Sequence, residues 1–223
     1  MDRVPEELLE KWLKGWSVSR GKPLPEAWKS GYRILVGDEE QKERYVFPEV
    51  NEDFISLSES IRKPWIYLKV CAPPEEFIRL IPQRWKIQPQ GYMMYGPERM
   101  EVHEKSFPDG YLMEIFEQQP DSFIVKINTM NNEEAAIGRL IIVGGLAIYD
   151  RIETEESHQR KGLATHVIKE LHRIAVSKGI SRNFLVATGQ GKLLYESLGW
   201  KVYSLYTSIV IKDENEVEIC NFN

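Results

Sequence analysis

Hydrophobic and polar positions alternate with two different periods in the second half of the chain. Apolar-rich segments are separated by polar or glycine turns such as Asn131-Asn132 and Gly144-Gly145, a pattern that predicts an antiparallel meander. Between residues 163 and 175 the apolar positions recur at helical spacing and form one stripe, and Gly179 ends the predicted helix. The predicted strands cover residues 111–116, 123–129, 136–143, 146–154, 184–188, 202–206 and 207–211, the last two as a final hairpin, with a second helix at 192–198.

The first half of the chain has shorter and less regular patterns. A helix is predicted at 5–16, because leucines and tryptophans recur there at helical spacing after Pro5. Residues 96–110 are polar and carry two prolines and two glycines, which places a boundary between a unit at 1–110 and a unit at 111–223. Within the first unit we expect a loop at 19–29, helices at 39–45 and 54–62, a short helix after Pro73, and strands at 32–36, 65–70 and 91–95.

Composition narrows the class of protein. The chain has 223 residues, 42% of them hydrophobic, and a formal net charge of −5, so a dedicated nucleic-acid binder is disfavoured. Membrane spans and an export signal are not evident, and two distant cysteines favour a reducing compartment. The four histidines show no metal-ligand spacing. We expect a cytoplasmic protein with no nucleic-acid partner, no membrane and no metal.

The segment Gln159-Arg160-Lys161-Gly162-Leu163-Ala164 joins a predicted strand to the predicted helix at 163–175. The first main-chain N–H groups of a helix lack intrahelical partners, and the helix dipole adds positive potential there, so the junction can bind an anion. Gly162 and Ala164 leave the backbone accessible, Arg160 and Lys161 add cations, and Thr165 adds a hydroxyl. On composition alone, a helix start with two solvated cations explains the segment equally well.

Two other glycine patterns do not fit phosphate-binding loops. Gly189-Gln190-Gly191 follows a strand, but Leu194 occupies the third glycine position of a dinucleotide fingerprint. Gly191-Lys192 is followed by Leu193, where a P-loop needs Ser or Thr for magnesium.

The junction resembles the coenzyme loop of the GNAT family, the Gcn5-related N-acetyltransferases. That loop has Gln or Arg, two residues, Gly, one residue, and Gly or Ala, and the segment 159–164 matches every specified position. The strands at 146–154 and 184–188 lie at the family's spacing, and residues 192–200 resemble its second signature. The resemblance covers roughly residues 111–212, and residues 1–110 fit a degenerate GNAT-like α/β lobe. It implies an α/β (α+β) GNAT fold: a mixed, mostly antiparallel central sheet flanked by helices, using acetyl-CoA as co-substrate.

The resemblance also implies roles for individual residues. The loop residues would hold the coenzyme pyrophosphate: Gln159, Arg160, Lys161, Gly162, Leu163, Ala164 and Thr165. The main chain of Ile152, Glu153 and Thr154 would pair with the pantetheine arm. Tyr195 would protonate the leaving thiolate, because the ordinary pKa of a phenol is close enough to that of a thiol for the proton to be passed on. A packing role for Tyr195 is the alternative, because Leu194 and Leu198 flank it on the same helix.

Strand alternation places Asp150 on one face with Leu146, Ile148, Ile152 and Thr154. An acid on an apolar face is a candidate general base. Family members place a base on this strand, at a position that corresponds here to Ile148 or to Asp150, and Ile148 cannot accept a proton. A structural salt bridge from Asp150 to Arg151 or another cation is the equal alternative.

We therefore expect an N-acetyltransferase that moves an acetyl group from acetyl-CoA to a primary amine of a small molecule by direct attack in a ternary complex. No cysteine lies near the signature segments, which disfavours an acetyl-enzyme. The amine would enter on the side built by residues 1–110 and the final hairpin, and the protein would be a monomer or a homodimer. The alternatives are a protein or peptide N-acetyltransferase and a catalytically silent coenzyme A sensor.

Overall fold

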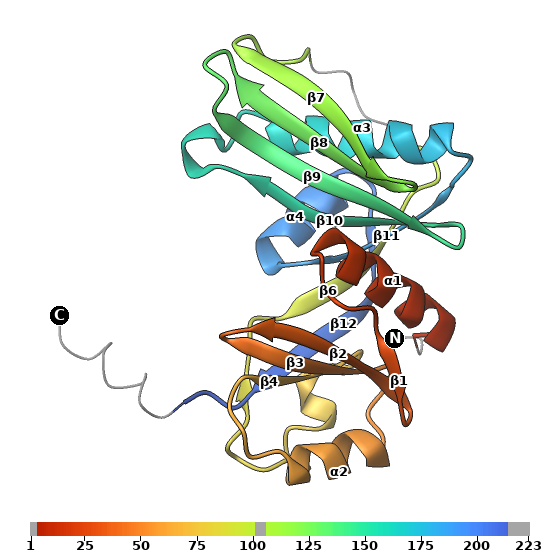
Figure 1. Cartoon of the computed structure of the whole chain (residues 1–223), viewed down its shortest axis with the longest axis vertical. Helices are drawn as coiled ribbons and strands as arrows, with labels where there is room; N and C mark the ends of the chain where they lie inside the picture. Colours follow the sequence, from red (N-terminus) through yellow and green to blue (C-terminus); the bar gives the residue numbers. More distant parts are fainter. Residues whose placement is uncertain (1–3, 101–105, 214–223) are drawn as a thin grey trace, which may run out of the picture.

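A single twelve-stranded sheet runs the length of the molecule in this computed structural model, with helices against both faces (Figure 1). The structure describes residues 4–100 and 106–213. The strand order is β1-β2-β3-β4-β12-β6-β11-β10-β9-β8-β7, and β5 pairs with β12 off this path. Among the described strands only β3–β4 and β10–β11 pair in parallel. The predicted fold class, a mixed and mostly antiparallel sheet flanked by helices, is confirmed.

The first half of the chain begins with a helix and then builds one end of the sheet. Leu9, Trp12, Leu13 and Trp16 recur at helical spacing on the buried side of the first helix. The elements are α1 Glu6–Ser19, β1 Glu26–Trp28, β2 Gly31–Asp38, β3 Gln41–Phe47, α2 Glu52–Ser60, β4 Ile66–Val70, the 3₁₀ turn η1 Pro74–Glu76, β5 Lys86–Ile87 and β6 Gly91–Gly96.

The second half follows the predicted order. The meander of β7, β8, β9 and β10 is confirmed, since each strand pairs antiparallel with the next. The elements are β7 Tyr111–Gln119, β8 Ser122–Thr129, β9 Glu134–Val143, β10 Leu146–Thr154, the 3₁₀ turn η2 Glu156–His158, α3 Leu163–Ser177, β11 Arg182–Ala187, α4 Gly189–Ser197 and β12 Lys201–Val210.

Three sequence predictions about secondary structure are wrong. The segment 19–29, predicted as a loop, contains β1, which pairs with β2. Residues 39–45, predicted as a helix, form a hairpin turn and most of β3, which pairs with β2 and β4. Lys, Glu and Arg favour helices in isolation, and the strands on both sides override that preference. The predicted final hairpin is one continuous strand, β12, without a turn after Tyr206.

Strands of each half of the chain pair with strands of the other half. β6 precedes residue 110, yet it lies between β11 and β12. The first part of β12 pairs with β6, and its second part, Thr207–Val210, pairs with β4. The division into 1–110 and 111–223 therefore stays a prediction, with hydrogen bonds crossing it in both directions.

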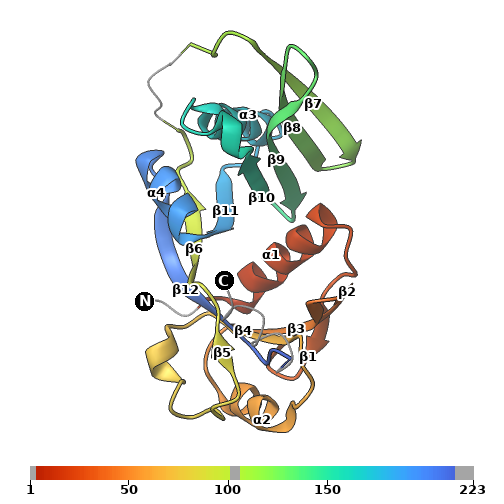
Figure 2. The same ribbon diagram turned by 90° about the vertical axis from the view of Figure 1, so that its left-hand side faces the viewer.

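Helices cover the sheet on opposite sides around β9 and β10. Figure 2 shows α1 on one side of these strands and α3 on the other. Ile148 and Leu146 pack with α1, whereas Ala147 and Tyr149 pack with α3 and α4. Each fully buried aliphatic side chain stabilises the fold by about 1.5–3 kcal/mol relative to exposure. The alternating apolar positions of β10 thus anchor both layers.

Neither a membrane-spanning helix nor a cluster of potential metal ligands is found among residues 4–100 and 106–213.

Candidate active site

Strands β10 and β11 separate part of the way along their length. They pair over Leu146–Ile148 only, after which β11 stays with β6 as far as Ala187. Within the described residues, the edge of β10 beyond Ile148 that faces away from β9 has no strand beside it. Main-chain N–H and C=O groups on such an edge are free to pair with an extended ligand. The predicted pantetheine contacts, Ile152, Glu153 and Thr154, lie on this part of β10.

A β-bulge in β10 corrects the predicted alternation of side chains. Between Asp150 and Glu153 the strand carries one residue more than β9, and Arg151 has a φ of 51°. The extra residue turns Ile152 to the α3 face, where it packs with Val167 and Leu171, while Asp150 stays on the α1 face. The prediction is therefore confirmed for Asp150, which shares a face with Ile148, and wrong for Ile152 and Thr154, which follow the bulge.

The loop before α3 leaves the helix N-terminus open. Gly162 is the N-cap with φ 82°, a left-handed conformation that suits glycine, and no side chain caps the helix. Arg160 is also left-handed, with φ 61°. Turns of this kind line up main-chain N–H groups into a concavity that binds anions, and the helix dipole adds to the attraction. Leu163 is buried in the core, whereas Gln159, Arg160, Lys161 and Gly162 are exposed.

Side-chain contacts fix parts of this loop. The Lys161 ammonium donates to the Tyr111 hydroxyl at 2.9 Å, and that hydroxyl also contacts His158 Nδ1 at 2.9 Å. Gln159 Nε2 donates to the main-chain oxygen of Thr154 at 3.3 Å. The Thr154 hydroxyl itself is buried without a hydrogen-bond partner among the described residues. The Gln159 contact thus holds the loop against the end of β10, where the Thr154 hydroxyl can still form a hydrogen bond.

Tyr195 lies on α4 beside the gap between β10 and β11. Its side chain is 8% exposed and packs against Trp200, with ring centroids 5.6 Å apart. Burial, and secondly the negative charge of Asp150, raise the pKa of Tyr195, so the phenol remains protonated at neutral pH. Packing and donor roles are therefore compatible in this side chain.

Asp150 forms the salt bridge that the sequence left as an alternative, and the partner is Arg20 at the end of α1. Arg20 donates to both carboxylate oxygens, each at 2.9 Å, and the Ser19 hydroxyl donates to Oδ2 at 2.6 Å. Oδ1 accepts only one of these hydrogen bonds and keeps a lone pair free. The carboxylate can therefore still accept a hydrogen bond from water or from an amine.

Ile148, at the other family position for a base, serves the packing of α1. It is fully buried, and a Cβ added to Gly15 would lie 2.4 Å from its Cδ1. Glycine at position 15 lets α1 approach β10 closely. This approach brings Ser19 and Arg20 onto Asp150.

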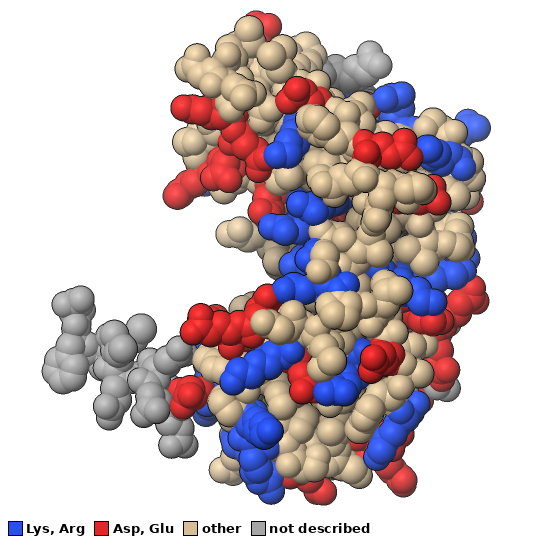
Figure 3. Space-filling view, viewed as in Figure 1, with Lys and Arg blue, Asp and Glu red and all other residues tan. Residues whose placement is uncertain are grey.

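Basic residues that the sequence analysis missed surround Asp150. Arg139 Nη1 donates to the main-chain oxygen of Ser19 at 2.6 Å, and its Nε is buried without a partner among the described residues. Arg139 and Arg20 come from strand and helix segments far from the loop, so no local sequence pattern signals them. Figure 3 shows Lys and Arg gathered across the hollow in the middle of one face, with acidic groups above and below.

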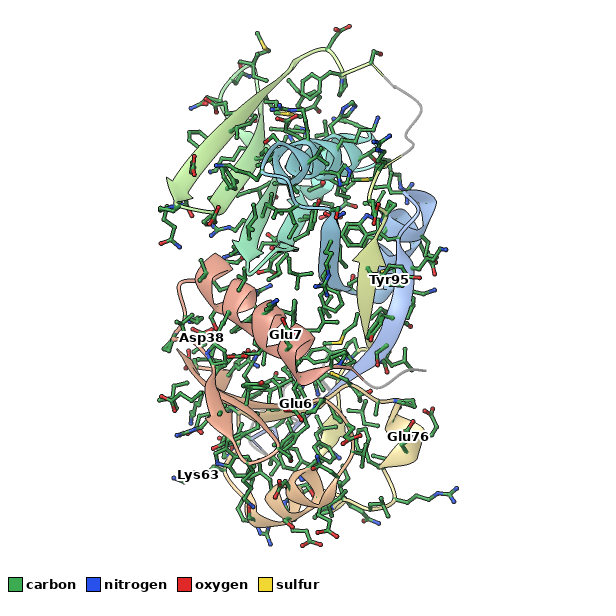
Figure 4. All side chains as sticks on the ribbon, turned by 90° about the vertical axis from the view of Figure 1, so that its right-hand side faces the viewer. Glu6, Glu7, Asp38, Lys63, Glu76 and Tyr95 are labelled. Atoms are coloured by element: carbon green, nitrogen blue, oxygen red, sulfur yellow. The ribbon has the colours of Figure 1, made fainter. Side chains whose placement is uncertain are left out.

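A cavity of about 760 Å³ lies at the other end of α1. Glu7 and Tyr95, which line it, are labelled in Figure 4, and Leu146 and Phe184 line it where β10 and β11 are still paired. It is therefore distinct from the gap beyond Ile148.

Comparisons with known proteins agree on the fold. No family model matches the chain, and no curated protein matches its sequence. A GCN5-related N-acetyltransferase from Kribbella flavida is similar with a TM-score of 0.64 at 16% identity, covering 92% of this chain and 95% of that one. A putative GNAT-family acetyltransferase from Novosphingobium aromaticivorans has a TM-score of 0.56 at 14% identity, covering 95% and 100%. A tandem GNAT protein from the clavulanic acid biosynthesis pathway has a TM-score of 0.57 at 10% identity, covering 81% and 78%.

The chain accordingly has the fold of the GCN5-related N-acetyltransferases. At 10–16% identity these similarities concern architecture, and the chemistry rests on the residues described above.

Proposed function

We propose that the protein is an N-acetyltransferase that transfers an acetyl group from acetyl-CoA to a primary amine of a small molecule by direct attack. One observation carries this proposal: β10 parts from β11 after Ile148, and the loop that follows β10 leads into an open, glycine-capped helix N-terminus. An extended ligand with a diphosphate at one end matches that arrangement.

The residues present fit acetyl-CoA. The left-handed Gly162 has no atom within 4 Å of where a Cβ would stand, so the backbone is accessible to a phosphate. The unpartnered Thr154 hydroxyl and the free edge of β10 offer hydrogen bonds to the amide groups of a pantetheine arm. Bound there, acetyl-CoA would supply an activated thioester.

The chain's own groups then support each proton transfer. A neutral amine attacks the carbonyl carbon, the C–S bond breaks, and the sulfur takes its proton from the buried Tyr195 hydroxyl. The proton lost by the amine passes to Asp150, directly or through water held at Oδ1. Main-chain N–H groups of β10 at the bulge would stabilise the negative charge on the carbonyl oxygen.

Two other functions predict different results in one assay. Thiol release from acetyl-CoA is measured with free amino acids, amino sugars, polyamines and basic peptides. Release with free small amines is expected. Release with peptides alone would favour protein acetylation, and tight coenzyme binding without release on any amine would favour a silent sensor. Failure to bind coenzyme A would refute the proposal.

A further inference from the structure

A row of basic side chains leads from the candidate active site into the interior. Arg20 pairs with Asp150 and lies 5.2 Å from the centroid of the Trp16 ring, and Arg44 of β3 lies 3.6 Å from the same ring. The ammonium of Lys69 on β4 lies 5.6 Å from the Tyr206 ring. The Arg20 side chain is 37% exposed, whereas Arg44 and Lys69 are 6% and 8% exposed. The row thus begins at the solvent edge and ends in the core.

Strand register places the inner members of the row on one face of the sheet. Lys69 lies opposite Val46 of β3 and Ser208 of β12. Arg44 and Tyr206 are two residues from those positions, and side chains two apart in a strand share a face. Helix α1 covers that face, because Val46 and Tyr206 pack in one hydrophobic cluster with the buried side chains of α1.

The two inner cations have no acidic partner within the described part of the chain. Arg44 donates to the Gln41 side-chain oxygen at 3.0 Å, and Lys69 donates to the Ser208 hydroxyl at 2.8 Å, both neutral acceptors. The Nε of Arg44 and the hydroxyl of Tyr206 are buried without a hydrogen-bond partner there. Tyr206 is 5% exposed.

This arrangement is costly without a ligand. Burial lowers the pKa of Arg44 to about 10, and burial followed by the charges of Arg44 and Arg20 lowers that of Lys69 well below its usual value. Neutral hydrogen-bond acceptors and aromatic rings replace only part of the hydration that these buried cations lose, and apolar residues of similar size would pack there at lower cost. An anion placed between them would favour the charged form of both side chains.

We propose that the acceptor amine carries a carboxylate, and that Arg44, Lys69 and the Tyr206 hydroxyl hold this carboxylate while the amine faces Asp150 and Tyr195. The proposal rests on the acetyltransferase function above and specifies its substrate class. The planar guanidinium of Arg44 suits a planar carboxylate, and Lys69 with Tyr206 supplies further donors. Arg44 and Arg20 lie against the same Trp16 ring, and Arg20 pairs with Asp150, so the row leads from the proposed carboxylate site toward Asp150.

The first experiment compares acceptors that differ only in the anionic group. Each L-amino acid of a panel is tested with its amide, its decarboxylated amine and, for glycine, aminomethylphosphonate. We expect kcat/KM to be at least about 100-fold higher for the acids. An acceptor without the carboxylate leaves the buried hydrogen-bond donors of the site unpaired, which strongly disfavours its binding. Equal use of amides and amines would overturn the inference, and preference for the phosphonate would overturn the carboxylate assignment.

The second experiment uses Arg44→Gln, Lys69→Met and Tyr206→Phe. Each is expected to raise KM for the acids about 10-fold or more while leaving the coenzyme Kd unchanged. Lys69→Met should also keep or raise Tm, because it removes an unpaired buried cation. A purely structural lysine would give a lower Tm and an unchanged KM, which would overturn the inference. Arg33→Gln, on the neighbouring strand and paired with Glu43, is the matched control and should leave KM unchanged.

The two proposals fail in different ways. Absence of coenzyme binding defeats the proposed function itself. Coenzyme binding with acetylation of amines, but no preference for acids, defeats only the carboxylate inference. If no amine is acetylated, the carboxylate inference is tested by thermal shifts of the coenzyme-saturated protein with each acid and its amide. A higher Tm with the acids alone supports the carboxylate site. The same Tm with acids and amides overturns the carboxylate site.

Discussion

The two halves of the chain each contain two parallel strands joined through a helix. The two units differ in how far their parallel strands stay paired. In the first half β3, α2 and β4 form this unit, and in the second half β10, α3 and β11 do. β3 and β4 stay paired from Glu43 to Phe47, whereas β10 and β11 part after Ile148. Only the second unit opens its sheet.

The N-termini of α2 and α3 also differ, and again the second half of the chain is the more open. At α2, the Asn51 side chain accepts from Phe54 N–H at 3.0 Å, and Glu52 and Asp53 lie in the first turn. At α3, Gly162 caps without a side chain, and no acid lies in the first turn. A closed and acidic helix end stabilises the fold, while an open one next to cations is available to an anion. The same strand–helix–strand unit thus serves support in one half and, we propose, coenzyme binding in the other.

The largest expected effect comes from closing the open helix end. Gly162→Glu places a carboxylate and a strained left-handed residue at the junction, so we expect the coenzyme Kd to rise at least about 100-fold. Isothermal titration measures it. Gly179→Glu is the matched control: Gly179 is also left-handed, with φ 75°, but lies at the far end of α3. Retained binding in Gly162→Glu would mean that the phosphates bind elsewhere.

Removal of the Tyr195 hydroxyl tests the chemistry beside the gap between β10 and β11. Tyr195→Phe should lower kcat about 100-fold, because the sulfur loses its proton donor, while coenzyme affinity stays the same. Steady-state kinetics and coenzyme titration separate the two effects. Tyr203→Phe on β12 is the control. An unchanged kcat in Tyr195→Phe would leave this tyrosine with a packing role only.

Gly15→Ala tests how closely α1 must approach β10. The added methyl would overlap Ile148, and overpacking of this kind costs about 1–3 kcal/mol of the free energy of unfolding. Urea denaturation measures it. At Gly189 no atom lies within 4 Å of an added Cβ, so Gly189→Ala should have little effect. If both variants are equally stable, the close approach of α1 is not required.

The smallest effect is expected at the closed helix end. Asn51→Ala should cost about 1 kcal/mol of the free energy of unfolding, because Phe54 N–H loses its cap. Coenzyme binding should not change, and Asn51→Asp should restore stability. Weaker coenzyme binding in Asn51→Ala would contradict the division of roles between the two units.

Local patterns were sufficient where they were regular. The stripe of α3, ending at Gly179, and the meander from β7 to β10 follow from side-chain periodicity, because each buries one face against a neighbour in sequence order. The loop from Gln159 to Ala164 was recognisable for a similar reason, since an anion site at a helix start uses consecutive residues. The roles of these residues remain predictions.

Other features depended on partners distant in sequence. Residues 39–45 have helix-forming side chains, and pairing with β2 and β4 makes most of them a strand. The extra residue in β10 was invisible because a bulge is defined only against the partner strand, here β9.

The sequence by itself determined the helix stripes, the meander and the glycine-containing loop before α3, because short-range periodicity and turn residues encode them. Only the tertiary structure decided that Arg20 pairs with Asp150 and that Arg44 and Lys69 are buried on the sheet face that α1 covers. Those residues come from α1, β3, β4 and β10, and their placement depends on sheet order and on the tight packing of Gly15 against Ile148. Contacts between distant segments leave no periodic trace in a single chain, so charge clusters of this kind emerge only when the fold is complete.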